Sequence, residues 1–322
     1  MKFEKIFTTS ATKLKNALRC ELIEKGYAPS QLHNKPMFLY AEGNAPYMLV
    51  AHLDTVHKNL PSIICYSKDG NYMMSPQGIG GDDRCGVYII LELLNKLPYK
   101  PYVLFTMDEE VGGVGAQVFM EYIVTTDMPD LKYIVEYDRK GNKDCVFYQC
   151  GNKEFVEFVE GFGFKKSYGT FSDISIIAPD LEVAAVNISS GYYNPHTEHE
   201  YVDIGDMNTI IEKSVKMLTT ECEKFEYIEE YKSYHSSYSQ YSSYNRRIDV
   251  TFLPAETVWI YSWVTDTWLV NEENEVAIDE YGNYYRYDKA YKDLITLKDV
   301  MPDDDFVPTY DPDNVKNLRV WF

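Results

Sequence analysis

Imidazole and carboxylate side chains recur in five short segments of this chain. They are Ala-His-Leu-Asp-Thr at 51–55, Gly-Gly-Asp-Asp-Arg at 80–84, Asp-Glu-Glu at 108–110, the single Asp138, and His-Thr-Glu-His-Glu at 196–200. Any one segment alone is more typical of an ordinary polar loop. If all five meet at one edge of a sheet, however, their carboxylates repel one another unless cations neutralise them. The set therefore predicts a metal site.

The donor types indicate which metal and which kind of site. Imidazole nitrogen and carboxylate oxygen without thiolate favour zinc, or another divalent first-row metal, in a catalytic rather than a structural site. His52 and Asp54 are two residues apart, so on a strand they face the same way, and Asp54 can fix the tautomer of the imidazole. Glu109 and Glu110 are neighbours and point in different directions. One of them can bind metal while the other stays free as a base.

The elements that must position these residues alternate between strands and helices. Asp69-Gly70 is a strong hairpin signal within residues 62–75. Apolar runs predict strands over 37–42, 47–52, 102–107, 132–138, 145–150 and 182–189, and helices over 10–25, 84–97, 114–125, 172–178 and 205–220. This order predicts an α/β fold, a three-layer α/β/α sandwich with a mainly parallel central sheet. In such a fold the ligand site lies at the carboxyl ends of the strands.

Composition divides the chain into three parts. Residues 1–226 carry every motif and are expected to form the catalytic domain. Residues 227–249 are rich in Tyr and Ser and form a connecting segment. Its tyrosines recur at helical spacing, which favours a packed tyrosine face over a disordered linker. Residues 250–322 are expected to be a β-rich accessory region, with strands within 257–270 and 281–288.

Charge and composition exclude several classes of protein. The 322 residues carry 31 basic and 50 acidic side chains, a formal net charge of −19, so a nucleic-acid partner is not expected. No window of about 18 apolar residues and no secretory signal is present, which excludes a membrane partner and predicts a cytoplasmic protein. The six cysteines lack CxxC spacing and are expected to be reduced and mostly buried.

Taken together, the motifs resemble those of a known superfamily. His-Leu-Asp at 52–54, Gly-Gly-Asp-Asp-Arg-Cys-Gly at 80–86, Asp-Glu-Glu-Val-Gly-Gly-Val-Gly-Ala at 108–116, Asp138 and the segment 196–200 follow the order of the co-catalytic di-zinc peptidases. That superfamily contains peptidase T, the carboxypeptidase-G-like amidohydrolases and the single-domain zinc aminopeptidases. The motifs that carry the resemblance span residues 50 to 205, about half of the chain.

The resemblance implies two zinc ions and a role for each of seven residues. His52 and Asp138 would hold one zinc, Glu110 and His196 the other, Asp82 would bridge both, Glu109 would be the general base, and Asp54 would orient His52. A bridging Asp needs a close approach of the backbone, which Gly80 and Gly81 permit. Only 57 residues separate Asp138 from His196, so this chain resembles the compact members of the superfamily in layout. The lid or dimerisation domain that two-domain members insert there is missing.

Other histidines and acids have alternative interpretations. His199 is an alternative to His196 as a ligand, and the family pattern favours His196. His33 and His57 match no family position and are expected on the surface or behind the ligands.

Two acidic residues next to the motifs also have more than one interpretation. Asp83 follows the bridging position as in peptidase T, or pairs with Arg84, or places a charge at a helix N-terminus. Asp173 resembles the Ser-Asp of related aminopeptidases, and a helix cap explains it equally well.

Three functions follow from these observations. The first is a zinc-dependent exopeptidase, an aminopeptidase acting on short peptides, with a homodimer compatible with the tyrosine stripe. The second is a deacylase or carboxypeptidase with the same metals. Its anionic substrates need a cation nearby, for which the sequence offers Arg84, Arg139 and Lys140. The third is a binding protein that has kept the fold; it is disfavoured because every ligand and the base are present.

Overall fold

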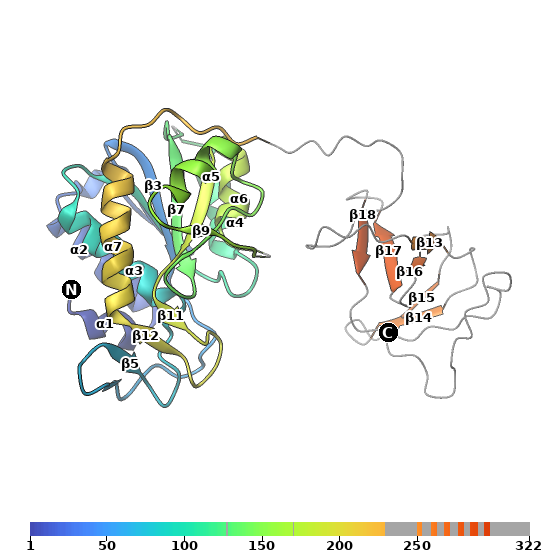
Figure 1. The fold of residues 1–322 in the computed structure, drawn as a ribbon, viewed down its shortest axis with the longest axis horizontal. Coiled ribbons are helices and arrows are strands. Elements are labelled where there is room, and N and C mark those ends of the chain that lie inside the picture. Colours follow the sequence, from blue (N-terminus) through green and yellow to red (C-terminus); the bar gives the residue numbers. More distant parts are fainter. Residues whose placement is uncertain are drawn as a thin grey trace. The chain divides into compact units, whose positions relative to one another are not determined.

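The structure is a computed structural model that describes residues 1–126, 128–169 and 171–228, together with the backbone of six short strands between 250 and 296. The chain separates into two compact units, Met1–Tyr231 and Lys232–Phe322. Figure 1 shows the first unit as layers of helices around a sheet.

The first unit is built on a sheet of eight strands. Their order is β1-β2-β6-β3-β7-β10-β8-β9, and the four central strands β6, β3, β7 and β10 are mutually parallel. The bounds are β1 Leu32–Asn34, β2 Phe38–Ala41, β3 Ala45–His52, β6 Pro101–Thr106, β7 Tyr133–Arg139, β8 Asp144–Val146, β9 Lys165–Lys166 and β10 Ala185–Ser189. The predicted α/β fold with a mainly parallel central sheet is confirmed.

Alternating side chains of the central strands divide the core into two layers. In β3, Leu49 and Ala51 pack on one face of the sheet, and Met48 and Val50 pack on the other. Helices α4 and α6 cover the second face, and α1, α2, α3, α5 and α7 cover the first (Figure 1). Strands buried on both faces read as continuous apolar runs, and those runs are the signal in the sequence.

The helices begin and end close to the predicted positions. Their bounds are α1 Phe3–Thr8, α2 Ala11–Glu24, α3 Gly81–Lys96, α4 Val114–Ile123, α5 Lys153–Glu160, α6 Ile174–Asp180 and α7 Ile204–Thr219, with a 3₁₀ turn at Pro29–Gln31. The short helices α1 and α5 were not predicted. Each spans no more than eight residues, too few for a helical period to stand out.

A second, four-stranded sheet lies beside the beginning of α3. Its order is β11-β12-β5-β4, with β4 Cys65–Tyr66, β5 Tyr72–Met74, β11 Tyr192–Tyr193 and β12 Tyr201–Asp203. The predicted hairpin at Asp69-Gly70 joins β4 to β5, where Gly70 has a φ of 74°. The predicted strand 145–150 is too long. It ends at Val146 because Tyr148 and Gln149 have positive φ values, which end an extended strand.

The second unit is described by the backbone of its strands. Strands β13 Val250–Phe252, β16 Val276–Asp279, β17 Tyr284–Asp288 and β18 Asp293–Thr296 form one antiparallel sheet, and β14 Trp259–Ser262 pairs with β15 Thr267–Val270. The β-rich character predicted for this region is confirmed. The part of the predicted tyrosine stripe that follows Ile228 lies outside the described residues.

The cysteines and the helices test two further expectations. All six cysteines are free, but only Cys85, Cys145 and Cys150 are buried, whereas Cys20 and Cys65 are exposed and Cys222 is half-buried. The expectation of mostly buried thiols is therefore wrong for half of them. Among the described residues, none of the helices combines the length and the apolar character that a membrane crossing requires.

Candidate metal centre

The five motif segments meet at the carboxyl ends of the parallel strands. His52 is the last residue of β3, and Asp138 lies near the end of β7. Asp82 lies in the first turn of α3. Glu110 belongs to the loop between β6 and α4, and His196 to the loop between β11 and β12. Parallel strands point their carboxyl ends to one edge, and so the fold gathers residues from across the sequence there.

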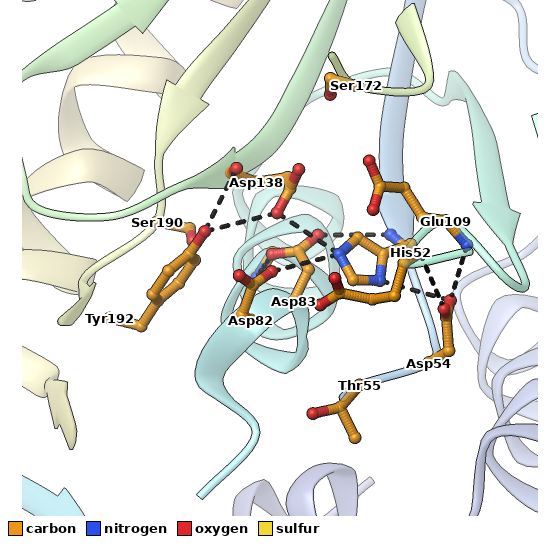
Figure 2. Close-up of polar contacts among 12 residues, drawn as sticks. His52, Asp54, Thr55, Asp82, Asp83, Glu109, Asp138, Ser172, Ser190 and Tyr192 are labelled. Atoms are coloured by element: carbon orange, nitrogen blue, oxygen red, sulfur yellow. Dashed lines mark hydrogen bonds and ion pairs between the residues drawn. The ribbon is translucent and has the colours of Figure 1, made fainter. Parts of the chain in front are cut away.

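Asp82 lies between two imidazole rings. Its Oδ1 atom is 3.2 Å from Nε2 of His52, and its Oδ2 atom is 3.2 Å from Nε2 of His196. Each imidazole also has a second carboxylate: Asp138 Oδ1 lies 3.4 Å from His52 Nε2, and Glu110 Oε1 lies 3.3 Å from His196 Nε2. Figure 2 shows Asp82 and Asp138 converging on His52. The arrangement has two centres. Each centre has one imidazole and one carboxylate of its own, and the Asp82 carboxylate is common to both.

Asp54 supports this arrangement from behind. Its Oδ1 atom lies 3.4 Å from Nδ1 of His52, on the side of the ring away from Asp82. The same carboxylate accepts hydrogen bonds from the backbone N–H groups of Glu109, at 3.2 Å, and of Glu110, at 3.1 Å. Asp54 therefore fixes both the orientation of the His52 ring and the backbone that carries the two glutamates.

The backbone is held in uncommon conformations at two points of the site. Asp108, which begins the Asp-Glu-Glu segment, has a φ of 60°, and His196 has a φ of 63°. Residues other than glycine rarely adopt this left-handed region, and where they do so the surrounding structure enforces it. Both positions therefore owe their geometry to the packing around them.

Asp83 supports the backbone of the site through its hydrogen bonds and does not share the position of Asp82 between the two imidazole rings. Its side chain is fully buried, and its Oδ2 atom accepts a hydrogen bond from the backbone N–H of His52 while Oδ1 accepts one from Gly86. Burial, with the charge of Asp138, raises the pKa of Asp83 well above its usual range. The suggested ion pair with Arg84 is wrong, because the Arg84 guanidinium donates to the backbone carbonyls of Ile6 and Thr9.

Several carboxyl groups lie close together in the site, and the negative charge of one makes ionisation of the next less favourable. Burial, reinforced by the charge of Asp82, raises the pKa of Asp138 to about 7. Burial also raises the pKa of Glu109 to about 8. Burial alone would raise the pKa of Asp82 as well, but hydrogen bonds with His196 and His52 hold it below its usual range. Such opposed shifts are typical of functional sites, and bound cations would relieve the repulsion.

The donor set fits metal ions. Two groups of side chains have ligand atoms that all lie within 4.8 Å of one another: His52, Asp83 and Asp138, and His52, Asp82 and Glu110. The Oε1 atom of Glu110 is buried and accepts no hydrogen bond, and its one ion-pair partner among the described residues is Nε2 of His196 at 3.3 Å. A buried carboxylate oxygen that accepts no hydrogen bond is costly, and coordination to a cation satisfies it.

Asn187 is a part of the site that the sequence did not reveal. Its side-chain oxygen accepts a hydrogen bond from the backbone N–H of Asp138 at 2.8 Å, and its amide group lies 3.4 Å from Asp138 Oδ2. The amide also donates to the hydroxyl group of Ser172 at 2.8 Å. Asn187 lies on β10, beside β7 in the sheet, so only strand pairing brings it to Asp138.

Among the described residues, the remaining candidates bond to groups other than the five proposed ligands. His199 is exposed, and its backbone, not its ring, makes the hydrogen bonds in this loop. His33 pairs with Glu42 and with the hydroxyl group of Tyr122. Asp173 makes no capping bond to α6; its carboxylate is buried and bonded to the hydroxyl group of Thr106.

Comparisons with known proteins were made on sequence and on structure. No family model matches the chain. A probable carboxypeptidase from Emericella nidulans is 34% identical over 108 residues, which are 32% of this chain and 23% of that protein. The match thus spans about a quarter of the length of the curated relative.

Solved structures are similar over a larger part of the chain. An aminopeptidase PepT from Bacillus cereus has a TM-score of 0.53 at 14% identity, covering 67% of this chain and 96% of the other. A tripeptidase from Staphylococcus aureus has a TM-score of 0.55 at 14% identity, covering 67% and 95%. The named neighbours are peptidases, as the motifs predict. The first unit of this chain thus has the fold of those peptidases, in agreement with the resemblance of its motifs.

Proposed function

We propose that this protein is a zinc-dependent exopeptidase, an aminopeptidase that hydrolyses short peptides. The observation that carries the proposal is the position of Asp82, whose two oxygen atoms each lie 3.2 Å from a different imidazole. A carboxylate with one oxygen for each of two centres suits a pair of divalent cations held about 3.5–4 Å apart. The fold and the peptidase neighbours support the same reaction class.

The proposed ligands divide between the two cations. His52 and Asp138 would hold one zinc ion, Glu110 and His196 the other, and Asp82 would bridge them. Two such ions would supply Lewis acidity at the scissile carbonyl and would lower the pKa of the attacking water. Asp54 keeps Nε2 of His52 directed at the first centre through its contact with Nδ1 at 3.4 Å.

Glu109 would act as the general base. Its backbone N–H donates to Asp54 at 3.2 Å, and Figure 2 shows its side chain near the His52 ring. Burial raises the pKa of its carboxyl group to about 8, so this carboxylate has a strong tendency to take up a proton. It would accept a proton from the attacking water and pass it to the departing amine. The excess of carboxylates around the site suits a substrate with a cationic amino terminus.

A carboxypeptidase or N-acyl amino acid deacylase with the same metals is the second candidate. The curated relative is named as a probable carboxypeptidase, which favours it. An anionic substrate needs a cation near the metals, and Arg84 is excluded because it is buried against the backbone of Ile6 and Thr9. Arg139, which follows Asp138 on β7, and Lys140 remain.

A substrate panel separates the two candidates. We would measure the zinc content of the full chain, and the hydrolysis of free dipeptides and tripeptides, N-acetylated dipeptides and N-acyl amino acids, with and without a chelator. Chelator-sensitive cleavage that requires a free amino terminus is the expected result. Cleavage of the acylated substrates alone would replace the aminopeptidase with the deacylase. Bound zinc without any cleavage would count against both and favour a binding protein.

A further inference from the structure

Glu200 is a buried carboxylate at the end of the segment that carries His196. Its side chain has no solvent exposure, and three donors surround it. Oε1 accepts a hydrogen bond from the backbone N–H of Asp82 at 2.9 Å. Oε2 accepts one from the backbone N–H of Gly80 at 2.9 Å, and lies 2.7 Å from Nε2 of His57. Every bond of this carboxylate except the one to His57 is therefore made to the backbone that presents Asp82.

The contacts leave this backbone little freedom. A Cβ atom on Gly81 would lie 2.7 Å from Cβ of Tyr192 and 3.2 Å from Oε1 of Glu200. A Cβ atom on Gly78 would lie 2.2 Å from the ring of His57. Glycines at these positions allow the loop to pass directly against the Glu200 carboxylate and the His57 ring. The loop and the two side chains therefore fit as one packed unit.

Glu200 joins two segments whose ligands face the same centre. His196 lies four residues before Glu200, and Asp82 donates its backbone N–H to Glu200. The Oδ2 atom of Asp82 and Nε2 of His196 are 3.2 Å apart. His52 and Asp138, in contrast, lie on β3 and β7, which pair directly in the centre of the large sheet. The large sheet therefore positions His52 and Asp138, whereas Glu110 and His196 lie on loops.

We propose that Glu200, held in place by His57, is a positioning residue that sets the distance between His196 and Asp82 and thereby determines the affinity of the second metal ion. This inference rests on the proposed dinuclear site. It gives His57, which lies 143 residues from Glu200 in sequence, a place in that site. Supporting groups of this kind commonly change metal affinity by about 10- to 100-fold when they are removed.

The substitution Glu200→Gln tests the inference because it keeps the size of the side chain. Only one of its two terminal atoms can accept a hydrogen bond, and so either Asp82 or Gly80 loses its partner. We would measure the binding of Co²⁺ to the metal-free full chain by calorimetry and by the visible spectrum of the bound ion. We expect the first ion to bind within about threefold of the wild type, and the second about 10- to 100-fold more weakly.

Glu198→Gln is the matched control. It removes the same charge from the same loop at an exposed position, and both ions should bind as in the wild type. His57→Phe removes the donor to Glu200 and should also weaken the second ion. His57→Gln restores an N–H donor and should recover part of the loss. These variants keep the inference testable if Glu200→Gln does not fold.

Three results would overturn the inference. In the first, Glu200→Gln and His57→Phe bind both ions as the wild type does. In the second, both ions are weakened equally together with a lower melting temperature, which would show that Glu200 only maintains the fold. In the third, the wild-type chain binds fewer than two ions, and then the proposed dinuclear site itself is wrong.

Discussion

Glu109 and Glu110 are neighbours in sequence but have different surroundings. Glu110 Oε1 lies 3.3 Å from the His196 imidazole, whereas none of the ion pairs among the described residues involves the carboxylate of Glu109. The two oxygens of Asp54 hold the two backbone N–H groups separately. These surroundings support the proposal that Glu110 binds a metal while Glu109 stays free to exchange protons, which is the division of roles that hydrolysis requires.

We predict that Glu109→Gln lowers the turnover of the protein on short peptides. The amide cannot accept a proton from water, and general-base catalysis contributes about 10²- to 10⁴-fold to a rate, so kcat on a short peptide should fall by about that factor. Metal content should stay at the wild-type level, because Glu109 is not a proposed ligand. The measurements are steady-state kinetics and metal analysis of the same sample.

Glu121→Gln on the exposed side of α4 is the control for Glu109→Gln, and its kcat should not change. Normal turnover in Glu109→Gln would exclude this residue as the base.

The beginning of α3 shows how an element positions the bridging carboxylate. Asp82 and Asp83 lie within the bounds of α3 but have non-helical backbone angles, with ψ values of 103° and 42°. One turn later, Gly86 packs so closely on β7 that an added Cβ would lie 2.1 Å from the carbonyl oxygen of Tyr137. The residue after Tyr137 is Asp138. The contact between helix and strand therefore fixes the approach of Asp82 to Asp138.

We predict that Gly86→Ala separates these two elements. The methyl group would meet the Tyr137 backbone and the Asp83 carboxylate, and neither is the free end of a flexible side chain. Overpacking of this kind costs about 1–3 kcal/mol of unfolding free energy. Metal affinity should fall as well, because Asp82 and Asp138 move apart. Denaturant unfolding and metal titration of the variant measure the two effects.

Gly161→Ala at the C-terminal end of α5 is the matched control for Gly86→Ala. Gly161 has a φ of −58°, and its added Cβ would meet nothing closer than 3.2 Å. This variant should keep its metals. If Gly86→Ala unfolds and binds metal as the wild type does, the helix–strand contact is not what sets the geometry of the site.

The proposed metal site gathers buried carboxylates in a chain that is acidic overall. The chain carries a net charge of −19, and buried carboxylates of the site raise one another's pKa values. Without cations the folded state must either keep protons on these groups or bear their repulsion, and both are unfavourable near neutral pH. Metal binding should therefore stabilise the first unit as a whole.

We predict that removing the metals lowers the melting temperature of this unit. An ion present at 100 times its dissociation constant contributes about 2.7 kcal/mol, and in a unit of this size each kcal/mol corresponds to about 2–4 °C. A chelator should thus lower the melting temperature by about 5–10 °C per ion, and added zinc should restore it. Differential scanning calorimetry measures the shift.

Asp82→Asn supplies the control for the chelator experiment. It lacks the bridging charge and should melt at nearly the same temperature with and without chelator. If neither chelator nor zinc changes the melting temperature of the wild-type protein, metal ions do not stabilise it.

The sequence by itself predicted a metal site and determined the class of fold. Apolar runs and their punctuation are local signals, so they located the central strands and long helices, and with them the ends at which His52 and Asp138 lie. The types of the motif residues predicted a metal site before any contact was known. Short elements such as α1, α5 and β9 were missed, because a few residues carry too little periodic signal.

Only the tertiary structure decided which groups support the motifs. Asn187 meets Asp138 across 49 residues, and Glu200 meets Gly80 across 120 residues. Periodicity and turn signals carry no information on such distant pairs, because these contacts exist only once strands pair and loops pack on one another. The same packing turned Arg84 from a candidate for substrate binding into a buried structural residue. The sequence specified which side chains can do the chemistry, and the fold specified which neighbours hold them in place.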